Sequence, residues 1–231
     1  TLVHIKDSDL PLVSLRMVAN SGSTSDPLDG AGLSHLMATM LCEGTENLTS
    51  QQISEEMEFM GSRLVSSASN EQSFIGAATL TQHWQRALEI IGDVSQNSSF
   101  PGDELSRVRK ERLVDLSRIS DDPTIIAQLA ARALLYGNNT PYGNSPFGTP
   151  TTISSFTPDH LGAQFSNIYQ PNKSTLVAVG DISTSDLISK ANDIFGRWKT
   201  SEPEFSHPND MTAESARQPT TIYIADKPGA A

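Results

Sequence analysis

The segment GLSHLMATMLCEGT, residues 32–45, predicts the central helix of the fold. Its apolar residues recur at i, i+3, i+4, i+7 and i+8, so they line one face of a helix: Leu33, Leu36, Met37, Met40 and Leu41. Gly44 follows as the expected C-terminal cap. The preceding stretch, NSGSTSDPLDGAG (20–32), breaks both the helical and the strand period and is predicted to be a loop.

The segments around this helix alternate between strand and helix patterns. Strands are predicted over 2–5 and 12–18, over the pair 62–69 and 73–81, and over 174–181. Helices are predicted over 50–60, capped by Thr49 or Ser50, and over 83–97, 101–123, 124–137, 157–169 and 183–198. This order predicts an α+β fold, a mainly antiparallel sheet with helices packed on one side.

Composition limits the kinds of partner. The chain of 231 residues is 37% apolar and has a net charge of −11, which disfavours nucleic acid as a partner. No run of about 18 apolar residues occurs, so no membrane span is expected in this segment. Cys42 is the single cysteine, so no disulfide can form within the chain, which fits a cytoplasmic or a periplasmic protein.

Both ends of the chain look like cuts from a longer polypeptide. A strand pattern begins almost at residue 1, without a charged-then-apolar signal segment. Residues 199–219 are polar and contain proline, and we expect a linker there, after a domain over 1–198. Residues 220–231 begin a further strand pattern.

The central segment resembles the signature helix of the insulinase/pitrilysin family of zinc peptidases, the inverzincins, whose site is H-x-x-E-H on a helix. The resemblance continues through SQQISEEMEFMGSRLVSSAS, FPGDELSRVRKERLVDL, LYGNNTPYGNSPFGTP and YQPNKSTLVAVGDI. These segments occur in the family's order and span nearly all of residues 1–225. The resemblance implies the α/β roll of processing peptidases, with 220–231 as the truncated start of a second, homologous subdomain.

In that family two histidines and a later glutamate hold zinc, and the glutamate before the second histidine is the general base. His35 matches the first histidine, whereas Ala38 stands at the base position and Thr39 at the second histidine. Asp115 falls nearest the third ligand, with Glu111 one turn earlier. Alanine cannot move a proton and threonine is a poor zinc ligand, so we expect no catalytic residue and no zinc in this chain.

The resemblance also implies a role for such a chain. Family members are built from homologous halves that close around a peptide, and in bacterial processing-peptidase-like forms one half lacks zinc. This chain resembles the first subdomain of a zinc-less half. The expected partners are therefore a zinc-bearing active half, on the same chain or a second subunit, and a peptide substrate. Family resemblance favours the bacterial periplasm or envelope, and the cytoplasm remains open.

Two other functions remain open from the sequence. One is a residual zinc peptidase with a rearranged ligand set, for which the candidate ligands are His35, Glu111 and Asp115. The other is a core-type subunit that keeps the fold for assembly alone. The Gly- and Pro-rich loop at 135–150 presents Tyr136, Tyr142 and Phe147, which either contact substrate or pin the loop to the body.

Overall fold

A single mixed sheet organises the described part of the chain. The computed structural model describes residues 1–138, 140–199 and 222. Its strands are β1 (Leu2–Lys6), β2 (Leu12–Ala19), β3 (Val65–Ala68), β4 (Ser73–Leu80) and β5 (Ser174–Gly180), in the spatial order β1-β5-β2-β4-β3. The pair β1 and β5 is parallel, and the other three pairs are antiparallel. The predicted α+β fold with a mainly antiparallel sheet is confirmed.

Alternation of side chains along the strands decides which face of the sheet is buried. In β2 the residues Val13, Leu15, Met17 and Ala19 are fully or almost fully buried. Between them, Ser14, Arg16 and Val18 point to the opposite face and are partly or fully exposed. A period of two therefore places one face of the sheet on the core and leaves the other open.

The helices are α1 (Leu33–Met40), α2 (Ser50–Phe59), α3 (Trp84–Asn97), α4 (Gly102–Ile119), α5 (Pro123–Tyr136), α6 (Pro150–Ser155), α7 (Pro158–Ile168) and α8 (Thr184–Phe195), with short 3-10 turns at Ser23–Ser25 and Thr81–His83. Side-chain caps define the residues at which several of these helices begin. Thr49 forms a capping box with Gln52 at α2, and Thr157 caps α7 with Pro158 in its first turn.

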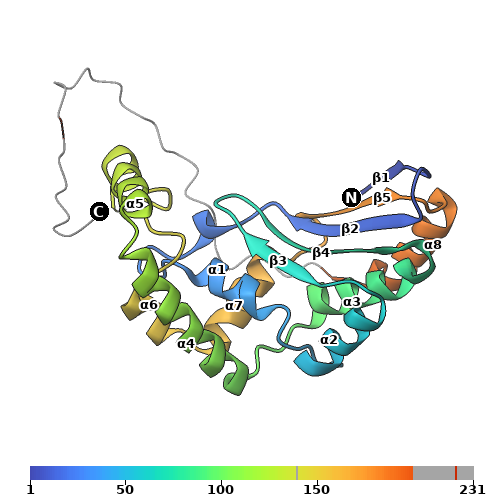
Figure 1. Cartoon of the computed structure of the whole chain (residues 1–231), viewed down its shortest axis with the longest axis horizontal. Helices are drawn as coiled ribbons and strands as arrows, with labels where there is room; N and C mark the ends of the chain where they lie inside the picture. The colour runs from blue at the N-terminus through green and yellow to red at the C-terminus, as the bar shows by residue number, and fades with distance from the viewer. Residues whose placement is uncertain (139, 200–221, 223–231) are drawn as a thin grey trace.

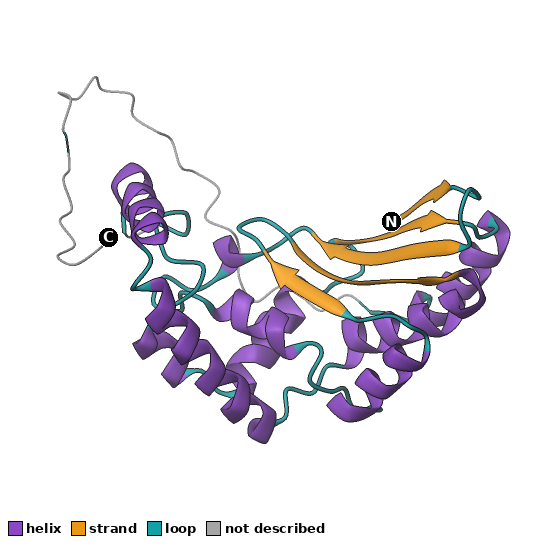
Figure 2. Ribbon diagram, viewed as in Figure 1, coloured by secondary structure: helices purple, strands orange, loops and turns teal. Residues whose placement is uncertain are grey.

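The helices form a layer under one face of the sheet (Figures 1 and 2). α3 packs against β2 and β4, and α1 packs against β3 and β4. α7 and α4 then pack against α1, and α8 packs against α3. The predicted placement of the helices on one side of the sheet is confirmed for these elements.

Two helix predictions need correction. α1 ends at Met40, with Leu41 as its C-cap, four residues before the expected Gly44. Gly44 instead forms an isolated antiparallel bridge with Thr49, so its positive φ of 135° serves a turn between α1 and α2. The second correction is α6, which the sequence pattern does not predict. Only its first residue, Pro150, belongs to the segment expected to be a loop, and the helix begins at a capping box formed by Thr149.

α5 is the exception to the layered packing. It projects beyond the end of the sheet, away from the other helices (Figure 1). Despite its apolar sequence it contains no buried residue, and Leu135 at its end is 78% exposed. Among the described residues, no helix is both long and apolar enough to cross a membrane. The expected linker at 199–219 and the strand start at 220–231 lie almost entirely outside the described residues.

Candidate functional site

The start of α1 is anchored by a buried carboxyl group. One oxygen of Asp26 accepts hydrogen bonds from the backbone N–H of Ser34 at 2.9 Å and from the Nε2 of Gln164, on α7, at 3.1 Å. The Ser34 hydroxyl donates to the same oxygen, and Gln164 also donates to that hydroxyl at 2.8 Å. Burial raises the pKa of Asp26 to about 7, against the lowering effect of the Ser34 bonds. This network ties α1 to α7.

Two glycines bring a distant loop onto the start of α1. Gly32 has φ +89°, and a Cβ there would lie 2.6 Å from backbone atoms of Gly148. Gly148 has φ +81°, and its own Cβ would lie 2.9 Å from the Ala31 carbonyl oxygen. The Thr152 hydroxyl donates to the same carbonyl at 2.8 Å. The close approach of the two glycine backbones places Phe147 beside α1.

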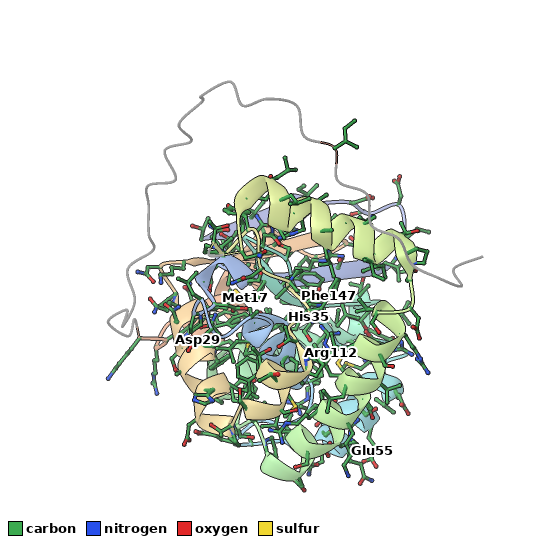
Figure 3. All side chains as sticks on the ribbon, turned by 90° about the vertical axis from the view of Figure 1, so that its left-hand side faces the viewer. Met17, Asp29, His35, Glu55, Arg112 and Phe147 are labelled. Carbon is green, nitrogen blue, oxygen red and sulfur yellow. The ribbon has the colours of Figure 1, made fainter. Side chains whose placement is uncertain are left out.

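Phe147 contacts both a histidine and an arginine, and the three labelled residues lie close together in Figure 3. Its ring centroid is 5.6 Å from the ring of His35, on α1, and 5.6 Å from the guanidinium carbon of Arg112, on α4. We call His35, Arg112 and Phe147 the Arg112 cluster. It draws on α1, α4 and the loop before α6, so it exists only in the folded chain.

The two titratable members of the Arg112 cluster are poorly solvated. Burial, and next the positive charge of Arg112, lower the pKa of His35 to about 4, so its imidazole is neutral at pH 7. Burial also lowers the pKa of Arg112. Nδ1 of His35 and both Nε and Nη2 of Arg112 are buried and have no hydrogen-bond partner among the described residues.

Of the other two positions of the degenerate motif, Ala38 is buried in the core and Thr39 is exposed. Ala38 is 1% exposed, and its carbonyl oxygen accepts a hydrogen bond of 2.6 Å from the Ser66 hydroxyl. The Thr39 hydroxyl donates to the His35 carbonyl, one turn earlier in α1, at 3.0 Å. Neither side chain offers a metal ligand or a proton acceptor beside the imidazole of His35.

The expected acidic residues of α4 are exposed and form ion pairs with arginines of the same helix. Glu111 is exposed and pairs with Arg107 at 2.9 Å, and Asp115 is exposed with its carboxylate 3.5 Å from Arg118. Across residues 1–138, 140–199 and 222, no three His, Cys, Asp or Glu side chains gather so as to hold a metal ion. A guanidinium ion beside His35 also repels a cation. The residues present therefore do not fit a zinc ion.

Arg112 is the residue that sequence reasoning missed. Counting without gaps to the nearest acid led to Asp115 and Glu111. Val108 and Arg112 are four residues apart, so they share the face of α4 that looks toward α1. The signal for Arg112 is its position one turn after the buried Val108, on the same face of the helix. A search restricted to acidic residues does not find it.

The aromatic residues of the loop at 135–150 separate into two groups. Phe147 joins the Arg112 cluster. Tyr136 and Tyr142 lie with their ring centroids 5.6 Å apart, and the Tyr142 hydroxyl donates to Glu71 in the turn between β3 and β4. Arg132 of α5 reaches Asn70 in the same turn at 3.3 Å. The two tyrosines thus fasten the loop and α5 to the end of the sheet.

Comparison with known proteins gives a consistent assignment. The family described as Insulinase (Peptidase family M16) matches residues 2–148, and the description Peptidase M16 inactive domain matches residues 155–230. An "Uncharacterized zinc protease" of Rickettsia felis is 25% identical over 190 residues, which is 82% of this chain and 46% of that protein. A "Non-peptidase homolog YmxG" of Helicobacter pylori is 24% identical, over 92% of this chain and 50% of that protein.

The fold is also found among solved structures. A crystal structure of a peptidase M16 inactive domain from Pseudomonas fluorescens has a TM-score of 0.81 and 23% identity, and the match covers 89% of this chain and 50% of that one. The chain spans about half the length of the curated relatives named above. A family match over more than half of the residues, together with the fold, shows that this chain belongs to the insulinase family, peptidase family M16.

Proposed function

We propose that this chain is part of a non-catalytic half of an M16 peptidase, which shapes the proteolytic chamber and binds peptide together with an active half. The observation that carries the proposal is the state of the motif helix. α1 keeps its buried apolar face and its anchor at Asp26, yet Ala38 and Thr39 replace the base and the second imidazole. The fold is kept while the means to activate a water molecule are absent.

Exposed apolar surface supports a role in an assembly. The open face of the sheet displays Val3 and Ile5, which are 42% and 57% exposed, and α5 displays Leu134 and Leu135. Large exposed apolar surfaces are rare on monomeric proteins, and where they occur they commonly mark a site of protein or peptide association. In the proposed assembly zinc resides in the active half, on the same polypeptide or on a second subunit.

Reconstitution tests this function. The full-length protein containing this chain is combined with an M16 half that carries an intact H-x-x-E-H motif and is encoded in the same genome. We expect peptide hydrolysis by the pair and little by either partner alone. Full hydrolysis by the zinc-bearing half alone would refute the chamber role. A pair that assembles but cleaves nothing would instead favour a structural assembly subunit.

A further inference from the structure

Arg112 stands out because its charge is half-buried without a counter-ion. Every other described arginine with a buried polar nitrogen has a partner for it: the Arg109 Nε donates to the Ile153 carbonyl at 3.2 Å, and the Arg132 Nε donates to the Tyr142 carbonyl at 3.2 Å. The charge of Asp115 raises the pKa of Arg112, but the Asp115 carboxylate forms its ion pair with Arg118, at 3.5 Å. Leaving a buried donor unpaired is unfavourable, because the group loses its hydrogen bonds to water and gains none in the protein.

The two unpaired atoms of Arg112 define the geometry of the missing partner. Nε and Nη2 lie on the same edge of the guanidinium plane, and their N–H bonds form a fork that matches two carboxylate oxygens. Arg86 shows the same fork in use within this chain, because its Nε and Nη2 donate to the two oxygens of Glu56. In Arg112 the same two donors are free of any described partner.

Charge selects the ligand class. The pKa of about 4 keeps His35 neutral, so the Arg112 cluster carries a single positive charge near pH 7. One charge matches a carboxylate better than a phosphate group, which carries up to two negative charges. The imidazole adds an uncharged hydrogen-bonding group through Nδ1, and the ring of Phe147 supplies an apolar wall.

We infer that the Arg112 cluster binds a carboxylate group of the peptide, held by the fork of Arg112 beside His35 at the place where active relatives are expected to hold zinc. This inference rests on the proposed function, since it names the chemistry by which the non-catalytic half engages peptide. Nε and Nη2 have almost no exposed surface, so a carboxylate reaches them only when neighbouring side chains move; the half-buried ring of Phe147 lies 5.6 Å from the guanidinium carbon.

The direct test observes the Nε–H group of Arg112 by NMR in the full-length protein labelled with nitrogen-15. Its signal is assigned by its loss in Arg112→Met. Titration with N-acetylglycine should shift this signal saturably, whereas the neutral N-acetylglycinamide and sodium chloride should not. The exposed Arg118 of the same helix serves as the internal control. No saturable shift, or an equal shift with the amide, would overturn the inference.

The second test measures peptide affinity with three versions of one sequence: a free C-terminal acid, a C-terminal amide, and the amide with one internal glutamate. We expect one acidic version to bind about ten- to a hundredfold more tightly than the plain amide, which identifies the source of the carboxylate. Arg112→Met and Arg112→Lys, which lacks the fork, should remove this preference, and Arg118→Met should keep it.

The two tests distinguish a failure of the carboxylate site from a failure of the proposed peptide-binding function. Peptides that bind with no preference for a carboxylate would leave the proposed peptide binding intact and overturn the inference. A saturable shift with N-acetylglycine, combined with no binding of any peptide, would keep the carboxylate site and refute the peptide-binding role.

Discussion

The pH dependence of folding should depend on Asp26. Its pKa is about 7 in the folded chain and 3.8 in the unfolded chain, because burial disfavours the charged carboxylate. The folded state therefore binds more protons than the unfolded state between about pH 4 and pH 7. The contribution of Asp26 to stability is complete below pH 3.8 and is lost as the pH rises through 7.

Asp26→Asn removes this titration and keeps the hydrogen bonds. An asparagine oxygen can still accept from Ser34 and Gln164, and its amide nitrogen would replace Oδ2, which has no partner among the described residues. The rise from 3.8 to about 7 corresponds to at most about 4 kcal/mol. Since the side chain is not fully buried, we expect the variant to be more stable at pH 8 by about 2 kcal/mol and nearly equal to the wild type at pH 4.

Urea denaturation at pH 4, 6 and 8 measures this difference, provided that the m-value is unchanged. Asp29→Asn, an exposed carboxylate in the same loop, is the control and should track the wild type at every pH. A variant of Asp26 that is less stable than the wild type at pH 8 would refute the reasoning. A difference that stays constant from pH 4 to pH 8 would do the same.

Three further predictions follow from the packing. Gly148→Ala should lower the free energy of unfolding, measured by urea titration, by more than about 2 kcal/mol, because the new Cβ would lie 2.8 Å from Ile153. Gly61→Ala is the control: its φ is +62° and no atom lies within 4 Å of the new Cβ, so backbone strain alone should lower the free energy by about 1 kcal/mol. Equal losses would contradict the close contact. The amides of α5 should exchange with deuterium faster than those of α3, because α5 has no buried residue, and similar protection would show that α5 is covered. Thr39→His combined with Arg112→Glu should acquire zinc affinity measurable by calorimetry, since His35 then gains two ligands and loses the neighbouring positive charge, and Thr39→His alone should not.

Helices and strands could be predicted from the sequence where their pattern depends only on residues close together in the chain. The alternation in β2, the capping threonines at 49 and 157, and the 3.6-residue period of α3 depend on neighbours in the chain, and the structure matches them. The predicted cap at Gly44 is wrong. A glycine after an apolar helix is typical of a C-cap, but here the positive φ of Gly44 belongs to a turn in which Gly44 pairs with Thr49. α6 was missed because six residues are too few to show a period.

The candidate site could be predicted only in part. The loss of the zinc motif is visible in Ala38 and Thr39 alone. The Arg112 cluster depends instead on the approach of Gly32 to Gly148, which are 116 positions apart, and on the face that α4 turns toward α1. Such contacts are set by tertiary packing. The helical period places Arg112 on the face of α4 that carries the buried Val108 and Leu116, but it does not show which residues of α1 and of the distant loop meet it there.

Zinc content tests the central claim most directly, namely that His35 no longer belongs to a metal site. The full-length protein is purified with added zinc, separated from any H-x-x-E-H partner half, dialysed and analysed by mass spectrometry for metal. We predict well under one zinc ion per chain and the same value in His35→Ala. One tightly held zinc ion per chain that disappears in His35→Ala would contradict the account.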